Sequence, residues 1–383
     1  MPSHRSLPTL LQTIRSTPIA RLSNLTRHLN GEIIVKLESA NPGGSLKDRA
    51  AWHILRTAER AGLLGPGSTI IESSSGNFSI ALAMIGAIRG YRIIAVVDPK
   101  ITPTNRGLLE AYGAEIIVVH EQDDSGSYHK TRIALANKLH SEIPNSFRPD
   151  QCFNLQNGEA HFSSTAPELA EQVGPGLRYV VCSVSTGGQI GGISRYFARH
   201  DPGVRVVGVD VHGSAIFGGP AHSYLTPGVG LSWTPDNIED LSRLHSIYKL
   251  TDQQAYDMTR TLARHEGLLA GVSTGACTLV ALTLAQQCRP GEQVACLAAD
   301  RGERYLATAF DEAWLASKGL DPRWKNVEEM TRMAASLTPW STDPVDCANY
   351  APELAEVLGS PTAGNPLYLP ADLLDGLDQE HAG

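Results

Sequence analysis

Short runs of apolar and β-branched residues recur along the chain, and longer stretches with a helical spacing of apolar positions separate them. The apolar character of these runs is nearly continuous, which is typical of parallel strands covered by helices on both faces. The stretches at 48–61 and 77–89 have the helical spacing and are followed by Gly62 and Gly90, as helix ends often are. The pattern therefore predicts an α/β fold, with strands at 33–38, 69–74, 92–98, 115–119, 179–185, 204–210 and 293–300.

The spacing of these runs predicts two lobes. Three runs fall between residues 65 and 120, and the next begins near residue 179. We interpret the interval between them, which contains Pro144 and Pro149, as rich in loops. Such a break favours two lobes with a cleft between them. After about residue 318 the composition shifts towards Pro, Asp and Ser, which predicts an appendage of short helices and loops.

Charge and composition narrow the classes of partner. The formal charge of -8 and the isoelectric point of about 5.9 argue against nucleic acid or an anionic membrane as the main partner. No apolar run approaches the roughly 20 residues that span a bilayer, and the N-terminal residues lack the apolar core of a signal peptide. We expect a cytoplasmic protein. The six cysteines form no C-x-x-C pair and the histidines show no ligand spacing, so we predict buried free thiols and no metal site.

Four stretches rich in glycine and hydroxyl residues lie just past predicted strand ends, where open parallel sheets bind ligands. They are NPGGSLKDR at 41–49, SSSGNFS at 73–79, STGGQIGG at 185–192 and GVSTGA at 271–276. In the third, backbone N–H groups and the hydroxyls of Ser185 and Thr186 precede a helical stretch, as in a phosphate cradle. A tight strand-to-helix turn without a ligand is the alternative interpretation of that stretch.

A lysine, Lys47, is framed by a proline, two glycines and a serine. A solvated lysine needs no such frame, because its flexible stem tolerates almost any backbone, so the frame indicates a lysine that is held in position. A phosphate cradle, a positioned lysine and Asn77 on another glycine turn together suggest pyridoxal phosphate. The aldehyde of that cofactor forms a Schiff base with a lysine, and its phosphate needs a cradle.

The order of motifs resembles a known family. N-P-x-G-S-x-K-D-R, S-S-G-N, S-T-G-G-x and G-E-R-Y-L follow one another as in the fold-type-II pyridoxal phosphate enzymes of the cysteine synthase and cystathionine β-synthase family, over roughly residues 8–316. Further stretches are similar to a siderophore and antibiotic branch whose type member makes N-(2-amino-2-carboxyethyl)-L-glutamate on the way to 2,3-diaminopropionate. These stretches are KLESANPGGSLKDR, VVDPKITPTN, YHKTRIA, SVSTGGQIGGISR, GSAIFG, PGVGLS and DRGERYL.

The resemblance implies a tryptophan synthase β-like fold. Two open, twisted parallel-sheet lobes would hold pyridoxal 5'-phosphate in the cleft between them. Residues 1–47 and 159–318 would form a larger lobe that binds the cofactor phosphate, and 48–158 a smaller, mobile lobe that binds the substrate carboxylate. Residues 319–383 would be a C-terminal appendage. The family also implies a homodimer that acts on small amino-acid substrates.

The resemblance also implies roles for single residues. Lys47 would form the Schiff base with the cofactor and later remove the α-proton of the substrate. Asn77 would hydrogen-bond the 3'-oxygen of the cofactor, a role compatible with a helix N-cap at that position. The cofactor phosphate would be held by Ser185, Thr186, Gly187, Gly188 and Gln189. The substrate carboxylate would be held by Ser74, Ser75 and Gly76, with Gln151 a weaker candidate.

The residue that meets the pyridine nitrogen is left open by a departure from the family pattern. Cysteine synthases place a serine just past the final strand, whereas this chain has Asp300 and Arg301 there. Asp300 would favour a protonated ring, Arg301 an unprotonated one, and Ser273 would offer a hydroxyl. We favour Ser273, because a neutral partner suits β-elimination.

Two further residues have competing interpretations. Arg132, in YHKTRIA, is a candidate for binding a second substrate anion, because a guanidinium binds carboxylate or phosphate with two hydrogen bonds. A solvated helix face is an equally good explanation of Arg132. Cys152 has no base placed beside it by any motif, so we expect it to serve in packing.

The chemistry implied is a transferase reaction, a β-replacement. An activated serine would lose its leaving group, and the resemblance to the branch implies that this serine is O-phospho-L-serine. The α-amine of an acidic amino acid would then add at the β-carbon, with L-glutamate favoured. The main alternative is a cysteine synthase that uses sulfide. A serine dehydratase is disfavoured by the similarity to the branch, and a regulated cystathionine synthase by the short tail. A non-catalytic scaffold is disfavoured by Lys47 and the preserved loops.

Overall fold

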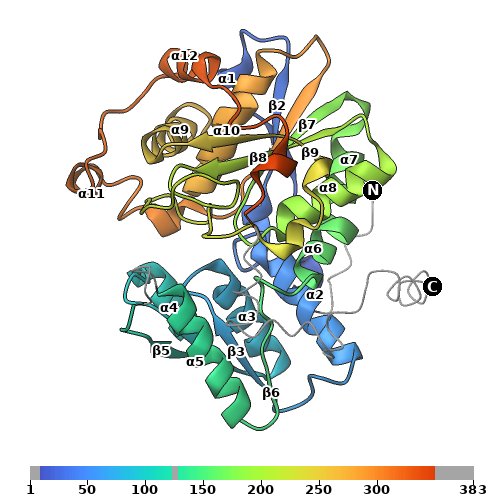
Figure 1. Ribbon diagram of the computed structural model, residues 1–383, viewed down its shortest axis with the longest axis vertical. Coiled ribbons are helices and arrows are strands. Elements are labelled where there is room, and N and C mark those ends of the chain that lie inside the picture. The colour runs from blue at the N-terminus through green and yellow to red at the C-terminus, as the bar shows by residue number, and fades with distance from the viewer. Residues whose placement is uncertain (1–8, 123–127, 350–383) are drawn as a thin grey trace.

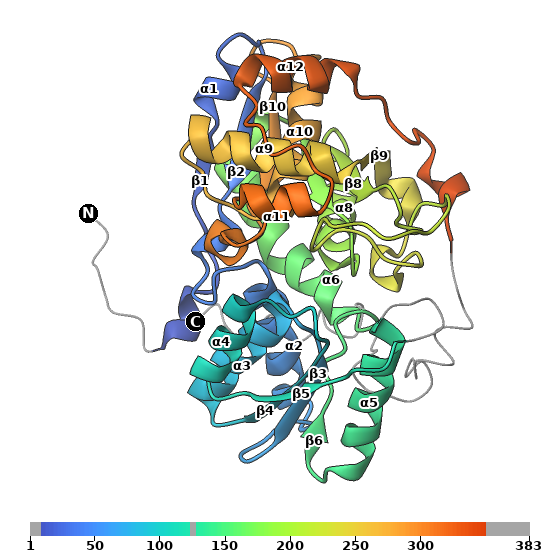
Figure 2. The same cartoon turned by 90° about the vertical axis from the view of Figure 1, so that its left-hand side faces the viewer.

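The computed structural model describes residues 9–122 and 128–349. Two parallel sheets form the cores of an upper and a lower lobe in Figure 1, and Figure 2 shows the same division from the side. The helix that begins at Lys47 lies where the two lobes meet. The predicted α/β architecture is therefore present.

The larger sheet has six strands in the order β1-β2-β10-β7-β8-β9. Only β1 runs antiparallel to its neighbour; the other pairs in this sheet are parallel. One face packs against α9 and α10, and the other against α7 and α8, so both faces are buried. The bounds are β1 (Ile19–Arg21), β2 (Glu32–Lys36), β7 (Leu177–Ser183), β8 (Arg205–Val211), β9 (Leu244–Leu250), β10 (Gln293–Leu297), α7 (Ala166–Val173), α8 (Gly188–His200), α9 (Asp252–His265) and α10 (Val272–Ala285).

The smaller sheet has four parallel strands in the order β5-β4-β3-β6. Its core on one side is formed with α2, α3 and α4, and on the other side with α5. The bounds are β3 (Thr69–Ser73), β4 (Arg92–Val97), β5 (Glu115–Val118), β6 (Ser146–Phe147), α2 (Lys47–Arg60), α3 (Asn77–Arg89), α4 (Pro103–Ala111) and α5 (His129–Glu142). The carboxyl ends of β3 and β4 lead into the loops that carry polar residues.

All seven predicted strands form. The prediction that the interval between residues 120 and 179 is rich in loops was wrong. That interval holds α5, α6 (Gln156–Ala160), a π-helix (His161–Thr165) and α7. The helical pattern of α5 is weak because Ile133 and Ala136 are its buried residues, while most of the helix is polar. Three strands were also missed, of which β9 carries polar residues inside the core, including Lys249.

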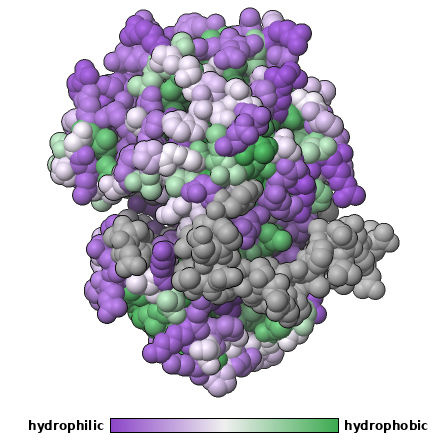
Figure 3. All heavy atoms as spheres, viewed as in Figure 1, coloured by the Kyte–Doolittle hydropathy of each residue, from purple (hydrophilic) through white to green (hydrophobic). Residues whose placement is uncertain are grey.

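The C-terminal part of the described chain packs on the larger lobe. Helix α12 (Val327–Ser336) contributes Met330 and Ala334 to the same core as α9 and α10. The remaining short elements are α1 (Ser23–Thr26), α11 (Glu312–Ser317) and the 3-10 helices Leu10–Thr13, Glu38–Ala40, Gly174–Gly176, Asp236–Ile238, Leu241–Arg243, Gly302–Tyr305 and Pro344–Cys347. In the face shown in Figure 3, hydrophobic residues appear as small separate patches. Within 9–122 and 128–349, no helix is long and apolar enough to cross a membrane.

Candidate active site

A pocket with about 500 Å³ of empty space opens between the two lobes. Residues from α2, α3, α8 and α10 and from the loops around them contribute to its wall. The structure thus brings together residues from all four of the predicted motif stretches, which are far apart in the sequence. The lining residues are Leu46, Lys47, Asn77, Ser183, Ser185, Thr186, Gly187, Gln189, Pro227, Gly228, Ser273, Ala299, Asp300 and Tyr305.

The turn before Lys47 is held by two charged side chains. The backbone N–H of Gly43 donates to Oδ2 of Asp48 at 2.6 Å, and Nη2 of Arg304 donates to the Gly43 carbonyl at 2.6 Å. A Cβ atom at Gly43 would collide with the Asp48 carboxylate, and Gly44 has a φ of +82°, which other residues rarely adopt. These constraints explain the two glycines of NPGGSLKDR. They place Lys47 at the first position of α2, facing the pocket.

Burial makes Lys47 unusually easy to deprotonate. Removing the ammonium from water lowers the pKa of Lys47 to about 8, and the nearby Cys152 opposes this shift only partly. A lysine with a pKa near 8 has a substantial neutral fraction near neutral pH, which attack on an aldehyde requires. Burial also raises the pKa of Cys152 to about 12, so this thiol stays protonated, as expected for a packing residue.

The glycine-rich loop after β7 has the geometry of an anion cradle. Helix α8 begins at Gly188, directly behind Gly187 with a φ of +81°, so the N–H groups of its first turn face the pocket end of the helix. A Cβ atom at Gly188 would overlap the side chain of Asn157. That asparagine donates through Nδ2 to Oγ1 of Thr186 at 3.0 Å and so fixes the loop. Because these donors and the helix dipole favour a doubly negative group, the loop fits the phosphate of pyridoxal phosphate.

Asn77, Asp300 and Ser273 also line the pocket. Asn77 is the first residue of α3, whose N-cap is Gly76, and its side chain turns away from the helix to donate to Oδ2 of Asp300 at 2.7 Å. Ser273, in the first turn of α10, is buried and lines the pocket. Arg301 is exposed and donates through Nε to the carbonyl of Ser39 at 3.0 Å, outside the pocket lining.

The predicted carboxylate loop, Ser74 to Gly76, directly precedes Asn77 but does not itself line the pocket. Its central residue, Ser75, is hydrogen-bonded to Asp98 and to Arg132. Arg132 is largely buried, with a side chain that is 12% exposed and an ion pair of 3.0 Å to Asp98. It therefore does not lie on a solvated helix face.

Gln151, the weaker candidate for the carboxylate, lies beside the phosphate loop. Its backbone carbonyl accepts a hydrogen bond of 2.9 Å from Nδ2 of Asn157, the residue that also bonds Thr186. Its side-chain oxygen is buried and has no hydrogen-bond partner within the described residues. Gln151 is not among the residues that line the pocket, so its contact with Asn157 is what links it to the phosphate loop.

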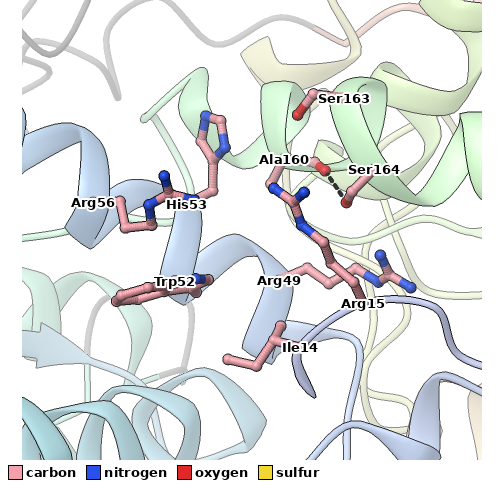
Figure 4. Close-up of a pocket in the computed structure, with 9 residues that line it drawn as sticks. All are labelled: Ile14, Arg15, Arg49, Trp52, His53, Arg56, Ala160, Ser163 and Ser164. Carbon is pink, nitrogen blue, oxygen red and sulfur yellow. Dashed lines mark hydrogen bonds between the residues drawn. The ribbon is translucent and has the colours of Figure 1, made fainter. Parts of the chain in front are cut away.

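A second pocket lies beside α2 and is rich in basic side chains (Figure 4). Its lining is Ile14, Arg15, Arg49, Trp52, His53, Arg56, Ala160, Ser163 and Ser164. The guanidinium of Arg49 is already paired with Glu38 and Glu168, each at 2.7 Å. His53 and Ser164 are hydrogen-bonded within the protein. These groups serve the structure around α2, so we do not assign a ligand to this pocket.

Sequence reasoning missed several residues that shape the active site. Asn157 supports the phosphate loop, Asp98 contacts the carboxylate loop, and Tyr305 donates to Asp300 at 2.6 Å. Asp98 and Tyr305 lie within VVDPKITPTN and DRGERYL, stretches that resemble the branch, so the similarity itself was the available indication. Across the described ranges, no three His, Cys, Asp or Glu side chains are grouped to hold a metal ion.

Comparisons with known proteins agree with this geometry. Residues 10–300 match the family described as "Pyridoxal-phosphate dependent enzyme". The chain is 39% identical over 311 residues to N-(2-amino-2-carboxyethyl)-L-glutamate synthase of Cupriavidus metallidurans, covering 80% of this chain and 91% of that protein. It is 38% identical over 356 residues to the protein of the same name from Ralstonia nicotianae, covering 91% of this chain and 98% of that protein.

Solved structures with related folds include two named synthases. O-ureido-L-serine synthase is 34% identical with a TM-score of 0.74, and the match covers 82% of this chain and 100% of that chain. The O-acetylserine-dependent cystathionine β-synthase of Helicobacter pylori is 30% identical with a TM-score of 0.73, covering 79% of this chain and 98% of that one.

Proposed function

The chain belongs to the pyridoxal-phosphate-dependent enzyme family, and on that basis we propose that it is a transferase that joins O-phospho-L-serine to L-glutamate. Its fold is that of the fold-type-II members of the family, as predicted. In the reaction the Cβ–O bond to phosphate breaks, a bond forms between Cβ and the α-nitrogen of glutamate, and inorganic phosphate is released. The observation that carries the proposal is the similarity to two proteins named N-(2-amino-2-carboxyethyl)-L-glutamate synthase, over 91% and 98% of their lengths.

Bound pyridoxal phosphate supplies the electron sink that lets the α-proton and the β-leaving group depart. Lys47 would hold the cofactor covalently and then take the α-proton of the substrate, a role supported by its burial and lowered pKa. The phosphate would be bound by the loop at the start of α8, which supplies Ser185, Thr186, Gly187, Gly188 and Gln189. Asn77 would hydrogen-bond the 3'-oxygen with an amide that Asp300 already orients.

The substrate-binding roles rest on the loop before α3. Ser74, Ser75 and Gly76 would bind the substrate carboxylate, and Gln151 would donate to it through its side-chain amide N–H group. Arg132 would supply positive charge for a second anionic group, the phosphate of the activated serine. The position of Arg132 against Ser75 supports this assignment, because it places the guanidinium beside the predicted carboxylate loop.

For the pyridine nitrogen we propose Ser273. It lines the pocket and is buried, and Asp300 is engaged by Asn77 and Tyr305. Arg301 is turned towards Ser39. A neutral hydroxyl leaves the ring less electron-demanding than an aspartate would, which suits elimination at the β-carbon.

The remaining assignments stay predictions. We propose that residues 1–47 and 159–318 act as the phosphate-binding lobe, 48–158 as the mobile lobe and 319–383 as an appendage; of these, 1–8, 123–127 and 350–383 lie outside the described residues. A homodimer and a cytoplasmic location are likewise proposed. The pathway that uses the product is proposed to be 2,3-diaminopropionate-type siderophore or antibiotic biosynthesis, by similarity to the two synthases.

The decisive experiment separates the amine from sulfide as the second substrate. Purified holoenzyme is mixed with O-phospho-L-serine, and the absorbance of the bound cofactor is followed. L-glutamate, L-aspartate or sulfide is then added in separate samples, and products are identified by mass. A carbon–nitrogen adduct and released phosphate with glutamate support the proposal. A product with sulfide alone identifies a cysteine synthase, and pyruvate without a second substrate identifies a dehydratase.

A further inference from the structure

The hydroxyl of Ser75 is the centre of a small polar cluster in the predicted carboxylate loop. It donates to Oδ2 of Asp98 at 2.9 Å and accepts from Nη1 of Arg132 at 2.8 Å and from the backbone N–H of Asp98 at 3.2 Å. The backbone carbonyl of Ser75 accepts from Nδ2 of Asn105 at 3.2 Å. The side chain and backbone of Ser75 are therefore fixed by β4, α4 and α5 together.

Asp98 is the residue that joins these elements. It follows β4 directly, and its Oδ2 atom meets both Ser75 and Nη1 of Arg132, the latter at 3.0 Å. Its Oδ1 atom accepts from the backbone N–H of Lys100 at 2.9 Å, which fixes the plane of the carboxylate. The side chains of Asp98 and Arg132 are each 12% exposed. In such a sheltered place, charge-assisted hydrogen bonds are strong and directional.

The Asp98 contact leaves much of the Arg132 guanidinium unused. Only Nη1 has a hydrogen-bond or ion-pair partner within the described residues, and the Nε atom is buried without one. A buried donor without a partner costs free energy unless water or a ligand satisfies it. The guanidinium of Arg132 is thus held at one nitrogen, and its other N–H groups remain available to bind an oxyanion.

We propose that Asp98 is a positioning residue that aligns both the carboxylate loop and Arg132 for a phosphorylated amino-acid substrate. This inference rests on the proposed function. A single carboxylate contacts both Ser75, in the loop proposed to bind the α-carboxylate, and Arg132, which is proposed to bind the phosphate. The substrate class that this arrangement selects is an amino acid with a second, strongly anionic group.

Two substitutions separate the two contacts of Asp98. Asp98→Asn keeps an oxygen that accepts from Ser75 but removes the charge that holds Arg132. We expect the dissociation constant for O-phospho-L-serine to rise by about 10- to 100-fold, because misplaced binding groups cost on that order. Binding of O-acetyl-L-serine, which lacks the phosphate, should change by less than about threefold. Asp98→Ala removes both contacts, so both substrates should bind more weakly.

The measurement is a titration of the cofactor absorbance with each substrate in the absence of glutamate. Because loss of the leaving group can follow binding, the titration gives an apparent dissociation constant, which is compared between each variant and the wild type. Glu115→Gln is the matched control, since it makes the same carboxylate-to-amide change in the 2.6 Å ion pair with Arg92 on the surface of the same lobe. In a double-mutant cycle, Asp98→Asn should add little to Arg132→Gln. Equal losses for both substrates in Asp98→Asn, or additive effects in the cycle, would overturn the proposal.

A second readout does not depend on any substrate. In the apoprotein, hydrogen exchange of the backbone amides at 74–77 should be faster in Asp98→Ala than in the wild type, and unchanged in Glu115→Gln. If wild-type protein binds no O-phospho-L-serine but exchange at 74–77 is faster in Asp98→Ala, the proposed substrate is wrong. The role of Asp98 in holding the loop is then still supported. Unchanged exchange in folded Asp98→Ala would contradict the positioning role itself.

Discussion

The amide of Asn77 donates to the carboxylate of Asp300 across the interface of the two lobes, with 2.7 Å between Nδ2 and Oδ2. Tyr305 donates to the same oxygen at 2.6 Å. Burial raises the pKa of Asp300, and these two hydrogen bonds act in the opposite direction by favouring the carboxylate. Because Asp300 takes one N–H of the amide, the other N–H and the amide plane are oriented before any ligand binds.

The first prediction concerns this orientation. Asp300→Asn should weaken pyridoxal phosphate binding by about 10-fold, because a charge-assisted hydrogen bond that holds Asn77 is replaced by a neutral one. The dissociation constant of the cofactor, measured by absorbance on reconstitution of the apoprotein, tests this. Asp343→Asn makes the same change at an exposed aspartate whose side chain forms no cap hydrogen bond, and it should leave the dissociation constant unchanged. Equal cofactor affinity in Asp300→Asn and wild type would show that Asn77 needs no such support.

The second prediction tests the partner of the pyridine nitrogen. Ser273→Ala should lower kcat by about 10-fold or more and shift the cofactor absorbance, because a hydrogen bond to the ring is lost. Arg301→Gln should do neither, since the Arg301 side chain bonds the carbonyl of Ser39. If Arg301→Gln shifts the absorbance and Ser273→Ala does not, our assignment is wrong and the arginine meets the ring.

The third prediction concerns pH. With the pKa of Lys47 lowered to about 8, the amine is mostly protonated below that pH and mostly neutral above it. The rate at which apoprotein combines with pyridoxal phosphate should therefore rise with pH and level off above about 8. An ordinary lysine would give a rise centred near its usual pKa of about 10.4. Lys47→Ala should show no such pH-dependent formation of the Schiff-base absorbance, whereas the exposed Lys138→Ala should behave as the wild type does.

The sequence predicted the strands and the residues of the pocket better than it predicted their supports. Lys47 and Ser185 lie close to Gly44 and Gly187, whose positive φ angles favour glycine, so these two residues can be found in the sequence. Asn157 and Asp98 lie on ordinary helical or strand-end positions, and their importance comes from contacts with Thr186 and Ser75 across the fold. Long-range contacts of this kind leave no local pattern.

Strand β9 was missed for a similar reason. Its residue Lys249 is buried, which a sequence pattern does not anticipate for a lysine. Its Nζ atom donates to the carbonyls of Ser214 and Gly218 at 2.9 and 2.5 Å and lies 3.7 Å from Asp210. The three oxygens compensate for the loss of water around the ammonium, so the lysine is tolerated in the core.

The C-terminal segment around Trp340 covers this same region. The indole Nε1 of Trp340 donates to the carbonyl of Phe217 at 3.0 Å, and Lys249 lies 4.7 Å from the centre of its ring. Nearby, Asn349 donates through Nδ2 to the carbonyl of Ala215 at 3.0 Å. These contacts help to hold the loop that begins after β8 and continues to Pro227 and Gly228 in the pocket wall.

The fourth prediction follows from these contacts. Trp340→Ala should raise the dissociation constant of pyridoxal phosphate by about three- to tenfold. The loop that carries Pro227 loses the hydrogen bond to Phe217, and Lys249, which donates to the same loop, loses its cation–π contact. Trp324→Ala is the matched control: its ring lies against Arg260 and Arg264, and its indole bonds Glu312, away from that loop. It should lower the melting temperature without changing cofactor affinity. If both variants lose cofactor equally, the appendage stabilises the lobe as a whole and does not act on the pocket loop.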